Sequence, residues 1–250
     1  MAQHQAEVDV WTTVLFNKFL AEPADKLLSA LGIKIEDPAH PWSNWMTMEI
    51  LVVILLMLLV LAVKRSLSVD RPGKMQHILE VLYGFFKEQT SEAIDHHREK
   101  YLPFFGTLFI FILFMNLIGI VPGFEAPTMT PAVPAGLAVS VFLYYNYMGM
   151  RAHGFGKYLA HFAGPFPFLA PLMIPIEIIS HLARPLSLTI RLYANMFAGE
   201  QVTIAFLSLT FLVIPVAFQG LHVFVSFLQA YIFMALAMLY VGSAVAHEEH

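Results

Sequence analysis

The chain has 250 residues, of which 58% are hydrophobic and only 13% are charged, and its formal net charge is −4. Soluble domains carry roughly 25% charged residues, so this composition predicts an integral membrane protein. The absence of cysteine excludes a disulfide framework and a thiolate metal site. The 14 Lys and Arg residues form no extended basic stripe, so we expect no nucleic-acid partner.

The N-terminal segment, residues 1–45, is mixed and polar. It lacks a basic region followed by a short apolar core, so it does not resemble a secretory signal. Residues 46–63 form the first apolar run, near the lower limit of roughly 17–25 residues for a membrane-crossing helix. Four basic residues follow it: Lys64, Arg65, Arg71 and Lys74. The positive-inside tendency therefore places the N-terminal segment outside and the end of this span in the cytoplasm.

Residues 74–98 alternate apolar and charged side chains at helical spacing, which predicts an amphipathic helix on the cytoplasmic face. The cluster Asp95-His96-His97-Arg98-Glu99 at its end resembles a metal site in composition. Adjacent residues on a helix do not converge on one ion, so a solvated helix end is the better interpretation. We expect no metal here.

Two further spans are predicted at residues 102–121 and 135–150. The loop between them, 122–134, carries Glu125 and four prolines and is expected outside. After the second of these spans come the basic or titratable residues Arg151, His153, Lys157 and His161. Their position returns the chain to the cytoplasmic side, in agreement with the first span.

The last part of the chain, 165–246, is about twice the roughly 40 residues that two ordinary spans need. It holds either three or four short spans or two very long helices. At 100° per residue, one stripe of polar residues shares a helical face: Glu177, His181, Arg184, Arg191 and Asn195. A second stripe consists of Gln219, His222, Ser226 and Gln229. Two continuous stripes favour two long helices, at about 168–208 and 213–246.

An antiparallel fold about a turn near Leu209 brings the two stripes together. Arg191 then lies opposite Gln229, Asn195 opposite Ser226, and Glu200 close to His222. Each helix would be more than about 50 Å long, whereas the hydrocarbon core is only about 30 Å thick. The predicted fold is therefore all-α and polytopic, a single membrane domain over 46–250 with about five membrane helices, the last two forming a strongly tilted hairpin.

Arg191 carries the most specific chemistry, because an arginine at mid-bilayer costs at least roughly 2.5–3.5 kcal/mol. It cannot give up its proton, so it acts as a fixed charge that repels protons and favours the ionised form of a nearby carboxylate. Glu200 facing His222 has the composition of an intramembrane proton relay. Single polar residues such as Ser187 or Ser226 are more simply explained by interhelical hydrogen bonds. Arg184 is interpreted mainly as an interfacial or structural charge.

Three stretches resemble subunit a of the bacterial F-type ATP synthase, a similarity that extends over essentially the whole chain. They are RPLSLTIRLYANMFAGE (184–200), FMNLIGIVP (114–122) and LQAYIF (228–233). The resemblance implies a proton-translocating stator subunit in the bacterial inner membrane. It also implies, as partners, a ring of small rotor subunits (the c-ring), the peripheral stalk and the remaining subunits of the complex. No cofactor is implied, and the chain would not be an enzyme by itself.

The resemblance also assigns residues. Arg191 would be the stator arginine that faces and deprotonates the ring carboxylate and prevents a proton short circuit. Four residues would line or shape the outer half-channel: Asn195, Glu200, His222 and Gln229. Glu177 and Ser187 would belong to the cytoplasmic exit path, with His181 on the same face, while Asn116 and Arg184 would be structural or channel-lining. The family usually has a carboxylate where this chain reads PTMTPAVP (127–134), so Glu125 becomes the candidate for the outer entry.

Other functions fit less well. A stand-alone ion-coupled secondary transporter would be expected to show internal repeats, and none is convincing. An intramembrane metallohydrolase would need a His-Glu-x-x-His pattern, which is absent. A passive scaffold leaves Arg191 unexplained. No Gly-x-x-x-x-Gly-Lys-Ser/Thr loop is present, so nucleotide chemistry would take place on other subunits.

Overall fold

The computed structural model describes residues 10–30, 41–68, 73–94, 98–121, 123–161, 170–209 and 213–246. Over these ranges the chain forms eight α-helices and two short 3-10 helices, and no strand. The all-α prediction is confirmed for the described part of the chain.

The predicted spans correspond to five of these helices, with shifted ends. The first span, 46–63, is α2 (Asn44–Ser66), and the third, 135–150, is α5 (Ala132–His153). The last two, 168–208 and 213–246, are α7 (Ala170–Leu209) and α8 (Val213–Val245). The boundaries of the long hairpin are therefore nearly as predicted.

The second span, predicted as 102–121, is the shorter helix α4 (Leu102–Ile118). It ends in a tight turn in which the amides of Ile120 and Val121 donate to the carbonyls of Leu117 and Ile118. A Cβ at Gly119 would lie 2.9 Å from the backbone nitrogen of Ala126, so the turn needs glycine for this close approach. The returning loop thus stops the helix earlier than the apolar run suggests.

The amphipathic helix is also shorter than its predicted range of 74–98. The helix α3 (Lys74–Ala93) ends at Ile94, whose side chain is buried and whose backbone is extended. A 3-10 helix, η1 (Arg98–Lys100), then leads into α4. Residues 95–97 of the acidic and histidine cluster lie outside the described ranges, and the residues that the structure does describe contain no group suited to a metal ion.

Two helices were not predicted: α1 (Trp11–Ala30) and α6 (Phe155–His161). The helix α1 packs on the start of α2, where the hydroxyls of Thr13 and Thr47 lie 2.7 Å apart and the amide of Val10 donates to Asn44 Oδ1 at 3.1 Å. Its polar residues face a polar patch on α2, so the segment has no continuous apolar stripe. An apolar-periodicity argument cannot detect such a helix.

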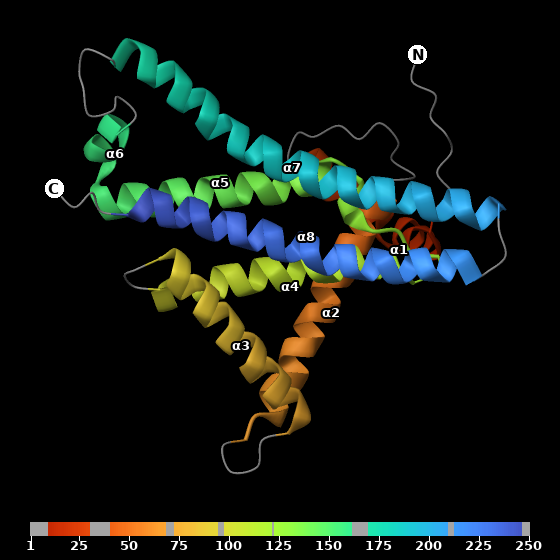
Figure 1. The fold of residues 1–250 in the computed structure, drawn as a ribbon. Coiled ribbons are helices and arrows are strands. Elements are labelled where there is room, and N and C mark those ends of the chain that lie inside the picture. The colour runs from red at the N-terminus through yellow and green to blue at the C-terminus, as the bar shows by residue number, and fades with distance from the viewer. Residues whose placement is uncertain are drawn as a thin grey trace.

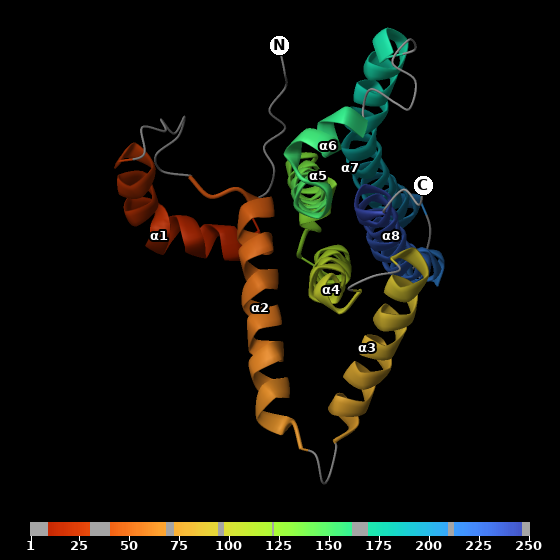
Figure 2. The ribbon, with the colours of Figure 1, turned by 90° about the vertical axis from the view of Figure 1, so that its left-hand side faces the viewer.

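The helices α4, α5, α7 and α8 run alongside one another, and α7 and α8 form an antiparallel hairpin (Figure 1). Their shared core includes Phe105 and Ile112 of α4, Leu192 of α7 and Phe233 of α8, all fully buried. The helices α2 and α3 leave this bundle as the two arms of a V (Figure 2). The bundle therefore holds the polar stripes, and the arms lie away from them.

The direction of α2 supports a tilted hairpin. By length and composition, two segments of the described helices could cross a membrane, Asn44–Arg65 and Val216–Val245, while α4 is apolar but shorter. The 23 residues of α2 span about 34 Å at 1.5 Å per residue, which matches the hydrocarbon core. The 40 residues of α7 span about 60 Å and run at a steep angle to α2 in Figure 1. Both helices cannot lie along one membrane normal.

Candidate functional site

Arg191 lies in the middle of α7 and is half-exposed. No described residue forms a hydrogen bond or ion pair with it. The ion pairs seen in the described ranges involve exposed side chains elsewhere, such as Lys26 with Glu22 and Lys87 with Glu99. The described part of this chain therefore supplies no carboxylate partner for Arg191.

The surface beside Arg191 is apolar, and one strip of it consists of small side chains. Leu186 and Ile190 are 60% and 55% exposed. Four small residues, all exposed, lie within about 60° of one face of α7 at 100° per residue: Ala183, Ser187, Ala194 and Ala198. Small side chains let a second helix approach the backbone closely. Ser187, predicted on the exit path, is one of these four small residues on the exposed face of α7.

Asn195 and Gln229 join the two legs of the hairpin. Asn195 Nδ2 donates to Gln229 Oε1 at 2.8 Å, and Gln229 is almost fully buried. The sequence placed Ser226 opposite Asn195, so the observed pairing differs by about one helical turn. Ser226 is fully buried, and its backbone carbonyl accepts from Asn116 Nδ2 of α4 at 3.4 Å.

Glu200 and His222 lie near each other but are not bonded. His222 is buried on α8, and a Cβ on Gly199 would lie 2.9 Å from His222 Nδ1. Glu200 follows this glycine directly, yet within the described ranges no hydrogen bond or ion pair joins Glu200 to His222. Gly199 was not singled out from the sequence, and its role is to make room for the imidazole.

Asn116 is held by a residue that the sequence reasoning missed. Thr128, in the 3-10 helix η2 (Pro127–Met129), is fully buried and donates its hydroxyl to Asn116 Oδ1 at 2.8 Å. The stretch 127–134, atypical because it lacks a carboxylate, thus supplies a hydroxyl that orients Asn116. Glu125, the candidate for the outer entry, is exposed just before η2.

A second polar cluster lies at the end of the bundle that holds α6. His181 Nε2 is 2.8 Å from Asn146 Oδ1, and Tyr158 donates its hydroxyl to the same oxygen at 2.9 Å. Arg184 stacks on two aromatic rings, 5.8 Å from the centre of Tyr145 and 5.2 Å from that of Tyr240. These contacts give Arg184 two aromatic partners inside the bundle.

Glu177, one turn before His181, is half-exposed. Two charged residues of α7 affect the pKa of Tyr158, on α6. Burial raises the pKa of its hydroxyl, while the positive charge of Arg184 lowers this pKa and the negative charge of Glu177 raises it. Glu177 and Arg184 therefore both act on this cluster.

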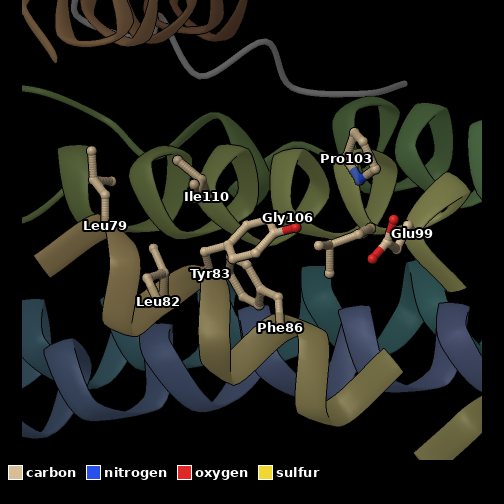
Figure 3. Close-up of a pocket in the computed structure, with 9 residues that line it drawn as sticks. Leu79, Leu82, Tyr83, Phe86, Glu99, Pro103, Gly106 and Ile110 are labelled. Carbon is tan, nitrogen blue, oxygen red and sulfur yellow. The ribbon is translucent and has the colours of Figure 1, made fainter. Parts of the chain in front are cut away.

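A groove of about 360 Å³ lies between α3 and α4 and contains none of the predicted site residues (Figure 3). Its lining is apolar apart from Tyr83 and Glu99. It also lies outside the α7–α8 hairpin. It offers no chemistry that connects to Arg191.

Comparison with known proteins agrees with these features. The family described as ATP synthase A chain matches residues 45–242. The chain is 62% identical to ATP synthase subunit a of Solibacter usitatus over 94% of this chain and 100% of that protein. It is 50% identical to ATP synthase subunit a of Koribacter versatilis over 95% of this chain and 97% of that protein. The chain therefore belongs to the ATP synthase A chain family of polytopic membrane proteins and is a membrane-sector subunit of an ATP synthase complex.

Proposed function

We propose that this chain is the proton-conducting stator subunit of the complex and presents two offset half-channels to a rotating ring of small subunits. One observation carries the proposal: Arg191 is half-exposed on an apolar helix face and has no carboxylate partner among the described residues. An uncompensated arginine facing lipid is costly, so a partner protein must bring the negative charge.

The shape of the α7 surface supports a helical partner. The exposed residues beside Arg191 include Ala183, Ala194 and Ala198, whose side chains are small. A ring helix could therefore approach α7 closely and bring its carboxylate within reach of the guanidinium. Arg191 would then stabilise the ionised carboxylate and release its proton. Because Arg191 cannot itself be deprotonated, it would also block a direct path between the half-channels.

The outer half-channel would follow Glu200, His222, Asn195 and Gln229, with Asn116 beside it. Two buried polar atoms on α8, Ser226 Oγ and Gln229 Nε2, have no hydrogen-bond partner among the described residues. Buried polar atoms normally have hydrogen-bond partners, so these two atoms favour a hydrated path between the helices over a dry helix contact. Glu125 would lie at its outer mouth.

The exit half-channel would follow Ser187 and Glu177, with His181 on the same face and Arg184 as a structural charge. We place the chain in the bacterial inner membrane with residues 1–45 outside and the C-terminus in the cytoplasm. Two helices support this orientation, because α2 ends with Lys64 and Arg65 and α5 ends with Arg151 and His153. The peripheral stalk and the other subunits would complete the complex, where the nucleotide chemistry takes place.

The test is ATP-driven proton pumping and passive proton leak in membrane vesicles that carry Arg191→Ala. Pumping should fall at least about a hundredfold, because the ring carboxylate loses its electrostatic partner. Arg151→Ala, an exposed arginine at the end of α5, is the matched control and should pump normally.

Assembly must be checked by copurification of the ring. A chain that copurifies with no ring of small carboxylate-bearing subunits would indicate a stand-alone ion-coupled transporter instead. Normal pumping by the assembled Arg191→Ala complex would contradict the proposed role of the arginine.

A further inference from the structure

His181 marks the place where α7 begins to pack on the bundle. Among the α7 residues whose side chains the structure describes, the buried ones lie along one face: His181, Leu188, Leu192 and Met196. Residues 171–180 are exposed or half-exposed, and the N-terminal end of α7 diverges from α5 and α8 in Figure 1. His181 is thus the first contact that sets how α7 lies and which way Glu177, one turn earlier, is turned.

The hydrogen bonds around His181 determine which ring nitrogen carries hydrogen. Asn146 Nδ2 donates to the carbonyl of Phe142 at 2.7 Å, which sets the orientation of the amide. Asn146 Oδ1 accepts from Tyr158 at 2.9 Å and lies 2.8 Å from His181 Nε2. An amide oxygen only accepts hydrogen bonds, so His181 Nε2 must be the donor.

The other nitrogen, Nδ1, is left to accept. The Tyr145 hydroxyl oxygen lies 3.3 Å from both ring nitrogens, and with Nε2–H committed to Asn146 it can donate to Nδ1. The neutral Nε2–H tautomer therefore fits the contacts of His181 with Asn146 and Tyr145. A proton added at Nδ1 would reverse this contact, because the Tyr145 hydroxyl would then have to accept.

The charged and titratable groups around His181 come from four helices. Tyr145 lies on α5, Tyr158 on α6, Tyr240 on α8, and Glu177 and Arg184 on α7 itself. The guanidinium of Arg184 is held over Tyr145, so a second cation on the imidazole would face like charge. Glu177 has the opposite effect, but its side chain is half-exposed.

We propose that His181 is a neutral latch and not a proton carrier: its Nε2–H bond to Asn146 holds α7 on α5 and positions the Glu177 side of the exit path. The inference rests on the proposed function, because it assigns a role within the exit half-channel. His181 is a positioning residue here, and protons would pass without binding to it.

Glutamine separates the two roles, since its amide can donate to Asn146 Oδ1 and accept from Tyr145 but cannot titrate. The experiment compares His181→Gln, His181→Leu and Asn146→Leu by ATP-driven proton pumping per assembled complex, between about pH 6 and 8. Ser140→Ala is the control on α5, because its hydroxyl bonds only within its own helix, to Gly136. His181→Gln should keep wild-type pumping and the wild-type pH profile.

His181→Leu and Asn146→Leu should each lower pumping by roughly tenfold or more. The double variant His181→Leu/Asn146→Leu should pump only slightly less than either single variant. A proton carrier predicts instead that His181→Gln fails as badly as His181→Leu, which would overturn the proposal. Normal pumping by both leucine variants would overturn it as well. In each case wild-type pumping and its loss in Arg191→Ala would leave the proposed function standing.

A spectroscopic measurement is independent of how well the variants assemble. In the assembled complex with ¹⁵N-labelled histidine, the signal that disappears in His181→Gln identifies His181. Two distinct ring nitrogens of the neutral Nε2–H tautomer, unchanged from about pH 8 to 6, are expected. An imidazolium signal in that range would contradict the latch.

Discussion

Two arginines on α7, seven residues apart, have opposite surroundings. Arg184 is stacked between the rings of Tyr145 and Tyr240, whereas Arg191 contacts no charged or aromatic partner in the described chain. Seven residues are nearly two turns, so both lie on similar sides of the same helix. One charge thus has partners within the described chain, and under the proposed function the other faces a partner subunit.

The strongest test of this comparison is to remove each charge in turn. Arg191→Ala should abolish pumping while the complex still assembles. Arg184→Ala should instead weaken assembly and leave pumping largely intact, because it removes two cation–π contacts worth on the order of 1–3 kcal/mol together and leaves Arg191 in place. Heating the detergent-solubilised complex and following the loss of assembled subunits would measure the second effect.

For Arg184→Ala, pumping per assembled complex should stay within about tenfold of the wild type. A complete loss of pumping by a well-assembled Arg184→Ala complex would make the two arginines functionally equivalent. The distinction drawn from their contacts would then fail.

A smaller effect is expected where Gly199 of α7 meets His222 of α8. Gly199→Ala would place a Cβ 2.9 Å from His222 Nδ1 and 3.3 Å from its Cε1, so the buried imidazole must move. Overpacking of this kind costs about 1–3 kcal/mol. Because His222 would be displaced from the outer path, proton pumping should fall roughly tenfold.

Gly220→Ala is the matched control for this substitution. It lies on α8 only two residues from His222, and a Cβ there would meet nothing within 4 Å. Equal pumping by the two alanine variants would show that the position of His222 does not matter for the proton path.

The hairpin could be predicted because the residues that define each of its faces lie close together in the sequence. Polar residues spaced at helical intervals within 177–195 and 219–229 define two faces, and hairpin geometry then brings the faces together. The predicted pairing was one turn off: Asn195 is bonded to Gln229, while the backbone carbonyl of Ser226 accepts from Asn116 of α4. A helix pair examined alone does not reveal a third helix.

The cluster around His181 could not be predicted for the same reason. Asn146 and Tyr158 come from α5 and α6, and neither stands out in its own segment. Only the packing of three helices gives Asn146 its two hydrogen-bond donors. Likewise α1 was missed because its contacts with α2 are polar, and polar contacts leave no apolar periodicity to read.

The smallest expected effect concerns Thr128, whose hydroxyl orients Asn116 of α4. Thr128→Val keeps the side-chain shape but leaves Asn116 Oδ1 without the bond of 2.8 Å that it accepts. A buried acceptor left unsatisfied costs about 1–3 kcal/mol. Asn116 Nδ2 still has its contact with the Ser226 carbonyl, so the Asn116 amide should become more mobile but stay close to α8.

We therefore expect the Thr128→Val complex to lose some thermal stability and to pump a few fold more slowly than the wild type. Ser243→Ala is its control, because that hydroxyl is exposed and bonds only to Tyr240 in its own helix. If Thr128→Val loses stability but pumps at the wild-type rate, Asn116 is structural and does not line the channel. If pumping falls while stability holds, the orientation of Asn116 matters to the proton path, and the loop 127–134 shapes the outer half-channel through a hydroxyl instead of a carboxylate.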